Sequence, residues 1–414
     1  MEKRKKIISA ALAMVMCVSA LGLPASAEGS EGDLCSVAAF VYKTTDDGFK
    51  YYVRANRPDR CVVVDYFGEE KDVVIPETID DCRVTAVAPL YNEKTYTKEF
   101  TTPVRSLTIN AEIKTFYGGF SGSDSIEKVV LPDTLETVYE DSFVNCDRLK
   151  EVVIPETVDH VGANSFRGTP WYSEKEKKEG LVILGKTLSS GSKAKGDVVV
   201  PDGVKYIASC AFWDNDEMTS LVIPKSVVQV ESEAVFSCDS LKKVTVKNGV
   251  ESLGWAAFEY NDSLEKLILT PSINAVGGEV IRTGSGKQAL KVYCCKGSYV
   301  EEALSELSQY NKKLKVCILP GKTSEFKVKA AKRRAKAEWK PVSTASGYQL
   351  QAALDSKFKT GCRTVTVKGK ASCSCNMTGL ESGSRYYLRL RTYRTVDGRR
   401  YYGNYCKAVK VKVK

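Results

Sequence analysis

Short apolar runs that end in proline recur along the middle of the chain. Four of them have three apolar residues before the proline, at residues 129–132, 152–155, 198–201 and 221–224. Adjacent proline slots lie 23 residues apart, and the slots at Pro155 and Pro201 lie 46 apart. Two later runs keep the spacing with Lys247 and Thr270 in the proline slot. A fixed period in the twenties predicts a solenoid in which each repeat forms one turn.

Other apolar residues return at fixed distances after the proline slot. Positions three, six and eleven carry, turn by turn, Leu135, Val138 and Phe143; Val158, Val161 and Phe166; Val204, Ile207 and Phe212; Val227, Val230 and Val235; Val250, Leu253 and Phe258; and Ile273, Val276 and Ile281. We expect these positions to point inward and to form stacked ladders. Position fourteen carries Cys146, Asn215, Cys238 or Asn261, whose side chains we expect to bond the backbone of the bend.

The segments around the repeats are predicted to cap or interrupt the solenoid. Residues 28–71 contain strand-like runs on either side of Asp47-Gly48, which is a hairpin turn signal. Residues 169–196 occupy the length of one missing turn, and we expect a turn with a bulged-out hairpin there. Residues 299–310 place apolar side chains on one helical face, so a helix and a strand at 316–319 should close the other end.

The chain after residue 320 follows a different pattern. Seven short runs alternate apolar and polar residues, as in Tyr386, Leu388 and Leu390 between arginines. Trp339 suits a buried core position, and residues 380–386 have the spacing of a tyrosine corner. These features predict a small β-sandwich.

The repeat motif resembles the BspA-like leucine-rich repeats of bacterial surface proteins, over roughly residues 72–319. The last segment resembles a fibronectin type III domain. The resemblances imply a mainly β chain, with a leucine-rich-repeat solenoid of about 23-residue period followed by a fibronectin type III β-sandwich. The expected division is a signal peptide at 1–27, an N-terminal β cap at 28–71, the solenoid with its helix and strand cap at 72–320, and the sandwich at 321–414.

The start of the chain predicts export. Four basic residues, 3–6, precede an apolar run at 7–23, and Ala25-Ser26-Ala27 suits a signal peptidase. We therefore expect a secreted or cell-surface protein that begins at Glu28. An uncleaved membrane anchor is the alternative, which the shortness of the apolar run disfavours. Thirteen cysteines follow residue 27, an odd number, so at least one should stay unpaired.

The sequence offers little for catalysis. His160 is the single histidine, and its place between two inward positions predicts an outward side chain. A histidine-based active site or a multi-histidine metal site is therefore not expected. The chain has no glycine-rich phosphate loop and no G-x-S-x-G or H-E-x-x-H motif. We expect a protein that is not an enzyme and that needs no metal or other cofactor.

The first candidate binding site is the outward row of the predicted repeat sheet. Its central residues are Thr108, Val130, Val153, Val199, Val222, Thr245 and Ile268, and the lysines beside them are Lys128, Lys243 and Lys266. An open sheet with an apolar stripe and charged flanks suits a ligand surface. The alternative is that β-branched residues occur there because they favour strands.

The second candidate site follows from an uneven charge distribution. Residues 1–320 carry 38 basic and 46 acidic residues, whereas residues 321–414 carry 23 basic and 5 acidic ones. The candidate residues are Lys332, Arg333, Arg334, Arg389, Arg391, Arg399 and Arg400. Outside a cell, a field of this sign attracts anionic polymers such as wall teichoic acids or acidic glycans. General solubility is the alternative, and export disfavours nucleic acid as the partner.

These features favour an extracellular adhesion or ligand-binding protein. The solenoid would present its surface to a protein or glycan, and the basic sandwich would serve as a spacer or a foot on the cell wall. The family resemblance implies the same role in surface attachment. The alternative is a non-catalytic, carbohydrate-binding accessory protein of a secreted polysaccharide-handling system, which a groove lined by Trp171 and Tyr172 would favour.

Overall fold

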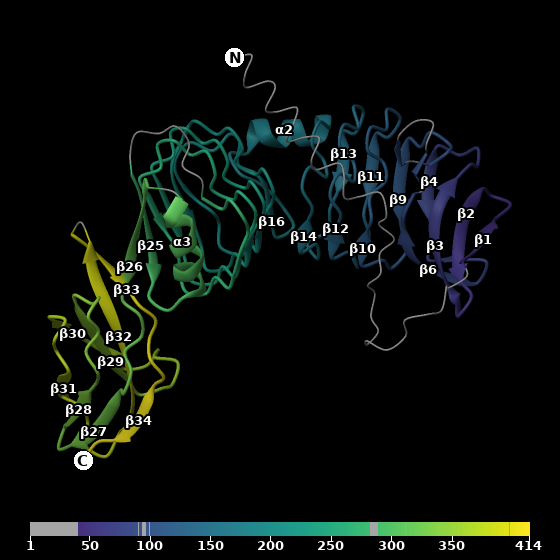
Figure 1. Cartoon of the computed structure of the whole chain (residues 1–414). Helices are drawn as coiled ribbons and strands as arrows, with labels where there is room; N and C mark the ends of the chain where they lie inside the picture. The colour runs from purple at the N-terminus through teal and green to yellow at the C-terminus, as the bar shows by residue number, and fades with distance from the viewer. Residues whose placement is uncertain are drawn as a thin grey trace. The chain divides into compact units, whose positions relative to one another are not determined.

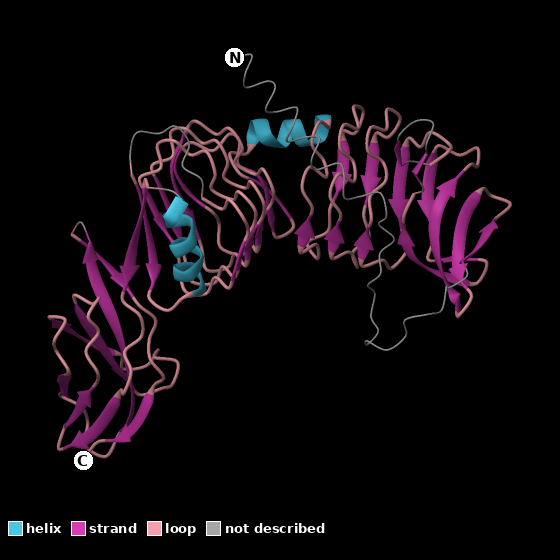
Figure 2. Cartoon of the chain, viewed as in Figure 1, coloured by secondary structure: helices cyan, strands magenta, loops and turns pink. Residues whose placement is uncertain are grey.

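The computed structural model describes residues 40–89, 91–92, 97–98, 100–281, 289–310, 312–396 and 398–414 (Figure 1). The expected signal peptide therefore lies outside the described residues. The described part is built mainly of strands, with two helices, α2 and α3 (Figure 2). Within it, no helix is both long enough and apolar enough to span a bilayer.

A five-stranded sheet precedes the repeats, in the order β1-β2-β3-β6-β5. Its strands are β1 (Phe40–Thr44), β2 (Phe49–Arg54), β3 (Arg57–Tyr66), β5 (Thr78–Ile79) and β6 (Cys82–Val87). The expected hairpin is confirmed, and Gly48 occupies its turn at φ +95, where a Cβ atom would lie 2.3 Å from the backbone of Gly68. This cap sheet extends past residue 71, because β5 and β6 pair with it while β4 (Asp72–Ile75) joins the repeats. A two-stranded sheet, β7 (Tyr91–Asn92) with β8 (Thr97–Lys98), follows.

The proline-terminated runs form parallel strands, which we call the front strands. The first group is ordered β13-β11-β9-β4 and comprises β4, β9 (Ser106–Ile109), β11 (Lys128–Val130) and β13 (Glu151–Val153). The second is ordered β17-β19-β21-β23-β25-β26 and comprises β17 (Gly196–Val199), β19 (Met218–Ile223), β21 (Lys243–Val246), β23 (Lys266–Ile268), β25 (Leu290–Cys295) and β26 (Leu314–Leu319). The front strands are thus interrupted between β13 and β17.

Shorter back strands form the other side of each turn. They are β10 (Thr115–Phe116), β12 (Thr137–Val138) and β14 (His160–Val161) in one sheet, and β15 (Val182–Leu184), β16 (Thr187–Ser190), β18 (Tyr206–Ile207), β20 (Gln229–Val230), β22 (Ser252–Leu253) and β24 (Ala275–Val276) in the other. β15 pairs antiparallel with β16, so the expected hairpin is present. The same insertion also forms α2 (Pro170–Lys178), a helix that the sequence pattern did not predict.

The core confirms the predicted ladders. Every residue expected at positions three, six and eleven is buried, except Val276, which is half-buried. Position fourteen bonds the bend as expected, since the thiol of Cys146 donates to the carbonyl of Phe120 at 2.8 Å and the Nδ2 of Asn215 donates to that of Gly191 at 2.6 Å. The cap helix is also confirmed as α3 (Tyr299–Tyr310), with Val300 and Leu304 buried.

Each turn bends at two recurring positions with positive φ. Position nine is held by Asp141, Asn164, Cys210, Glu233, Ala256 and Glu279, and position thirteen by Asn145, Gly168, Asp214, Ser237 and Tyr260. A left-handed backbone is disfavoured for most of these residue types. The repeat geometry therefore imposes these bends on the chain, turn after turn.

The C-terminal segment forms two sheets around a separate core. One contains β27 (Lys327–Ala331), β28 (Arg334–Glu338) and β31 (Ser374–Thr378), and the other β30 (Arg363–Lys368), β29 (Gly347–Ala353), β32 (Arg385–Val396) and β33 (Arg399–Tyr402), with β34 (Val409–Lys412) paired to β32. There are eight strands instead of the expected seven, because β32 turns back into β33. Trp339 is buried as predicted, and the hydroxyl of Tyr386 accepts the N–H of Glu381 at 3.3 Å, which is the expected corner.

Candidate functional site

The outward residues of the front strands lie in hydrogen-bonded register. Val130 is paired with Thr108 and Val153, and in the second group Val222 is paired with Val199 and Thr245. We call these residues, with Ile268, the sheet row. Val153 and Val199 are the most exposed, at 46% and 59%, whereas Val130, Val222 and Thr245 are half-buried. The sheet row is thus two apolar segments, with its most exposed residues on either side of the interruption.

Ile268 departs from the expected exposure. It occupies the predicted register, opposite Thr245 and Tyr293, but only 6% of it is accessible. It is covered because Tyr293 and Cys295 of β25 and Leu319 of β26 pack with it. The accessible part of the sheet row therefore ends at Thr245.

The flanking lysines occupy two different environments. The Nζ of Lys128 forms an ion pair with Glu151 at 2.7 Å, so its charge is matched on the same sheet. Lys243 and Lys266 are paired neighbours in adjacent strands, and Lys266 lies 4.9 Å from the ring centroid of Tyr293. Two adjacent lysines on one face create a locally positive edge beside the second apolar segment.

A groove of about 550 Å³ lies at the interruption of the front strands. Val152 and Ile154 line one side, Pro201 and Asp202 the other, and Ile183 and Leu184 of the inserted hairpin also contribute. Trp171 of α2 lines the groove as well. Helix α2 begins here because Thr169 caps it, accepting the N–H of Tyr172, with Pro170 in the first turn.

The two aromatic residues of α2 differ in their contribution to the groove. The Trp171 ring packs edge-on against Phe166 at 5.1 Å and lies 5.5 Å below the Lys175 ammonium. Tyr172 is buried, its hydroxyl lies 2.9 Å from that of Ser189, and burial raises its pKa to about 12. Tyr172 does not line the groove, so the pair does not form the aromatic platform that a sugar ring would need.

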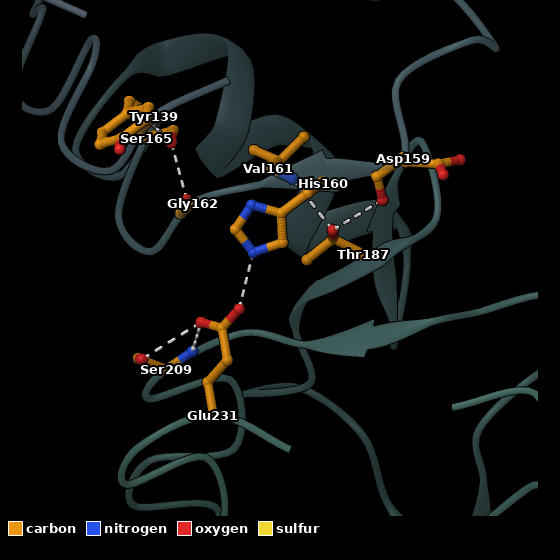
Figure 3. Close-up of polar contacts among 9 residues, drawn as sticks. All are labelled: Tyr139, Asp159, His160, Val161, Gly162, Ser165, Thr187, Ser209 and Glu231. Atoms are coloured by element: carbon orange, nitrogen blue, oxygen red, sulfur yellow. Dashed lines mark hydrogen bonds and ion pairs between the residues drawn. The ribbon is translucent and has the colours of Figure 1, made fainter. Parts of the chain in front are cut away.

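The single histidine lies in a polar cluster on the back strands (Figure 3). Its Nε2 atom is 2.8 Å from Oε1 of Glu231, and Oε2 of Glu231 accepts the N–H and hydroxyl of Ser209 at 3.0 and 3.2 Å. The imidazole also meets the Tyr206 ring edge-on. Because Ser209 bonds the carboxylate and not the imidazole, these groups lack the order of a nucleophile, a base and an orienting acid.

Asp159 joins three consecutive turns next to this cluster. Its carboxylate pairs with Lys186 and, at 2.5 Å, with Lys205. These hydrogen bonds hold the pKa of Asp159 below its ordinary value. The contacts of His160 and Asp159 therefore fasten the first group of turns to the second, across the insertion.

The candidate basic residues of the C-terminal segment fall into two groups. Lys332, Arg333 and Arg334 are exposed at the turn between β27 and β28, and Arg333 has φ +51. Arg389 and Arg391 lie on the outer face of β32, whereas Arg400 lies in β33 and is exposed. The side chain of Arg399 lies outside the described residues.

Arg389 and Arg391 belong to a stack of arginine and aromatic side chains that the sequence pattern did not predict. The Arg389 guanidinium lies 3.9 Å from the ring centroids of both Phe358 and Tyr405. That of Arg391 lies 3.9 Å from Tyr402 and 4.5 Å from Tyr405. Burial lowers the pKa of Arg391 below its ordinary value. Only the alternating arginines and the tyrosine-rich segment after β32 could have indicated this stack from the sequence.

The cysteines behave as packing residues. All twelve that the structure describes are free thiols, so no disulfide joins Cys362, Cys373, Cys375 or Cys406. Burial raises the pKa of Cys238 to about 12, which suppresses its reactive thiolate form. Among the described residues, no three acidic, cysteine or histidine side chains are arranged to hold a metal ion.

The parallel front strands, the short back strands and the stacked inward ladders define a leucine-rich-repeat solenoid. The family model of the BspA type leucine rich repeat region matches residues 96–188 and 190–285, in six copies. No curated protein matches the chain in sequence.

The chain also has low sequence identity to several solved structures. The T. pallidum leucine rich repeat protein is 18% identical, covering 64% of this chain and 95% of that one, with a TM-score of 0.25. The pneumococcal vaccine antigen PcpA is 16% identical, covering 69% and 99%, with a TM-score of 0.28. The FN1-FN3 domains of chicken CNTN1 are 17% identical, covering 24% and 35%, with a TM-score of 0.21.

Proposed function

We propose that this chain is an extracellular adhesion protein that binds a protein or glycan ligand through the sheet row. The observation that carries the proposal is the register of the sheet row, which aligns Val199, Val222 and Thr245 side by side on adjacent strands. Val199, an apolar residue, is 59% exposed on this open face. Apolar residues kept on an open face of a solenoid are typical of a recognition surface.

We propose further that the chain is not an enzyme. The polar cluster around His160 supports this, because its hydrogen bonds connect solenoid turns and the hydroxyl of Ser209 donates to the Glu231 carboxylate and not to the imidazole. The BspA type repeats support a place outside the cell, on the surface or secreted. A ligand-binding role needs only a persistent surface, which stacked turns provide.

The C-terminal segment is proposed to be a fibronectin type III sandwich that serves as a spacer or a foot on the cell wall. Its two sheets and its tyrosine corner support the assignment. The exposed turn of Lys332, Arg333 and Arg334 carries three positive charges. Such a turn would attract anionic wall polymers, and salt would weaken the attraction because exposed charges are screened.

The test of the foot is co-sedimentation of the chain with purified Gram-positive cell walls. We expect pelleting at low salt and release at about 1 M salt, where the Debye length falls to about 3 Å. The variant Lys332→Gln with Arg334→Gln should pellet less, whereas the matched variant Lys225→Gln with Lys247→Gln should pellet like the wild type. Equal pelleting of both variants would reject the proposed binding of the C-terminal segment to the cell wall.

The test of the sheet row is a panel of immobilised extracellular-matrix proteins and polysaccharides, probed with the labelled chain. Retention by protein surfaces alone would support protein binding. Retention by polysaccharides alone would favour the accessory carbohydrate-binding role instead. Retention by neither would reject adhesion as the function.

A further inference from the structure

One front strand is absent from the solenoid, although the matching back strand is present. The proline slots at Pro155 and Pro201 are 46 residues apart, whereas Pro201 and Pro224 are 23 apart. In the back sheet this interval is occupied by β16, which pairs with β18, and the Thr187 hydroxyl accepts the N–H of Val161 at 3.0 Å. In the front, α2 takes the place of a strand in the sequence. Figure 2 shows α2 where the run of front strands is interrupted.

The last front strand before the interruption has an unpaired edge. Among the described strands, β13 pairs with β11 alone. The N–H of Glu151 donates to the carbonyl of Glu127, and the carbonyl of Val153 accepts from Leu131 at 3.1 Å. Alternate residues of a parallel strand bond to opposite neighbours. The N–H and C=O groups of Val152 and Ile154 therefore face the groove.

The same edge leaves part of the core uncovered. Val152 and Ile154 are only half-buried, whereas Val129 and Leu131, at the same positions of the preceding turn, are 0% and 3% accessible. A further strand beside β13 would cover these side chains as the strands of other turns do. Burying these apolar side chains and forming the ladder hydrogen bonds would both stabilise a strand bound at this edge.

The groove also carries a pattern of charge. Glu156 and Asp202 each follow a proline slot, on opposite sides of the groove, and both are exposed. Neither forms an ion pair with another described residue. At the other end, the N–H of Trp171 donates to the carbonyl of Leu149 at 3.0 Å, so α2 closes the groove where β13 begins. Lys175 and Lys186 also line the groove, but they pair with Glu179 and Asp159. The carboxylates of Glu156 and Asp202 are therefore the charges at the groove that no described ion pair neutralises.

We propose that this groove binds an extended peptide segment of a partner protein as an additional parallel strand beside β13. The segment would place apolar side chains at alternate positions, over Val152 and Ile154. A lysine or arginine after them would lie between Glu156 and Asp202. This site lies in the gap between Val153 and Val199 of the sheet row, but it uses the backbone edge of β13 and not the outward side chains, so the proposal holds whether or not the sheet row binds a ligand. Strand addition to an open sheet edge is a general mode of peptide recognition.

The probe is the capped peptide SLKKVTVKNG, which has the sequence of the chain's own residues 240–249. It has valines at alternate positions followed by a lysine. Binding to the full chain is measured by fluorescence anisotropy, with a scrambled peptide of the same composition as the reference. Hydrogen exchange is followed at the amides of Val152 and Ile154. We expect the probe to bind at least tenfold more tightly than the scrambled peptide, and to slow exchange at these two amides.

Paired variants test the charge pattern. The double variant Glu156→Gln with Asp202→Asn should weaken binding of the probe at least tenfold. It should not change the binding of a probe whose last lysine is replaced by glutamine. Asp133→Asn, at the repeat position of Glu156 in the preceding turn, should have no effect. Equal binding of the scrambled peptide, unchanged exchange at Val152 and Ile154, or equal losses in all acidic variants would each overturn the proposal. Displacement of the probe by a neutral oligosaccharide such as cellohexaose would assign the groove to sugars instead.

Discussion

Phe143 is the centre of an aromatic ladder that fills the first group of turns. It is fully buried, and its ring centroid lies 5.2 Å from Phe116, 5.7 Å from Phe120 and 5.4 Å from Phe166. Phe143→Ala removes the ring while both neighbouring turns remain in place, so the cavity cannot close easily. Burial and cavity terms for Phe→Ala amount to about 3–5 kcal/mol. Because the ring also loses three aromatic contacts, we expect the free energy of unfolding to fall by an amount at the upper end of this range, about 4–5 kcal/mol.

The matched control is Phe236→Ala. Phe236 also contacts two rings, stacking on Trp213 at 4.6 Å and meeting Tyr260 edge-on at 5.1 Å, but it is half-buried at the surface of its turn. Its replacement leaves an opening to solvent and no enclosed cavity, so we expect a loss of about 1–2 kcal/mol.

The assay is native-state hydrogen exchange resolved by peptide mass spectrometry. A single unfolding free energy is poorly defined for a chain with more than one core, whereas local protection is measurable. The turns of a solenoid stabilise one another mainly through nearest neighbours. In Phe143→Ala, the protection of amides from hydrogen exchange should therefore fall about a thousandfold in the turns around residue 143, and much less beyond Val204. An equal fall for Phe143→Ala and Phe236→Ala, or a uniform fall along the chain, would refute this reasoning.

Two further predictions concern the insertion and the bends. The pKa of Asp159 is lowered in the folded state by Lys186 and Lys205. Its contribution to folding stability is therefore present above about pH 4 and is lost as the pH falls through the lowered pKa of the folded state. Asp159→Asn should therefore lower the melting temperature at pH 7, by an amount that shrinks as the pH falls below about 4. Ala256 and Ala257 are both fully buried, but only Ala256 has a positive φ, at +52. Ala256→Gly should therefore be neutral or stabilising, and Ala257→Gly should cost about 1 kcal/mol, as melting curves will show.

Much of the solenoid was predictable because its interactions repeat. A residue such as Phe212 faces the same environment as Phe143 and Phe258, so one period fixes the burial of all three. The interruption was predictable only in part. The spacing of the proline slots indicated one irregular turn, but not that the back strand would remain while the front strand was lost. Helix α2 has no apolar face, and its single sequence signal was Thr169 followed by Pro170.

The remaining differences arise from contacts between residues that no period relates. Ile268 is buried by Tyr293, which lies in a strand outside the regular repeats. His160 and Glu231 are 71 residues apart and meet because the back strands bring their turns together. The guanidinium of Arg389 is held between Phe358 and Tyr405, which come from separate loops. Such contacts depend on the folded arrangement of loops, which neither composition nor alternation specifies.

The most direct test of the proposed function is adhesion by a sheet-row variant on whichever surface retains the wild type. The variant is Val153→Lys, Val199→Lys and Val222→Lys, all on the front strands. The matched control places lysines on the back strands, by Thr137→Lys, Gln229→Lys and Ser252→Lys. We predict that the sheet-row variant binds at least tenfold more weakly, which corresponds to about 1.4 kcal/mol, while the control binds like the wild type. Equal binding by both variants would contradict the assignment of the ligand surface to the sheet row.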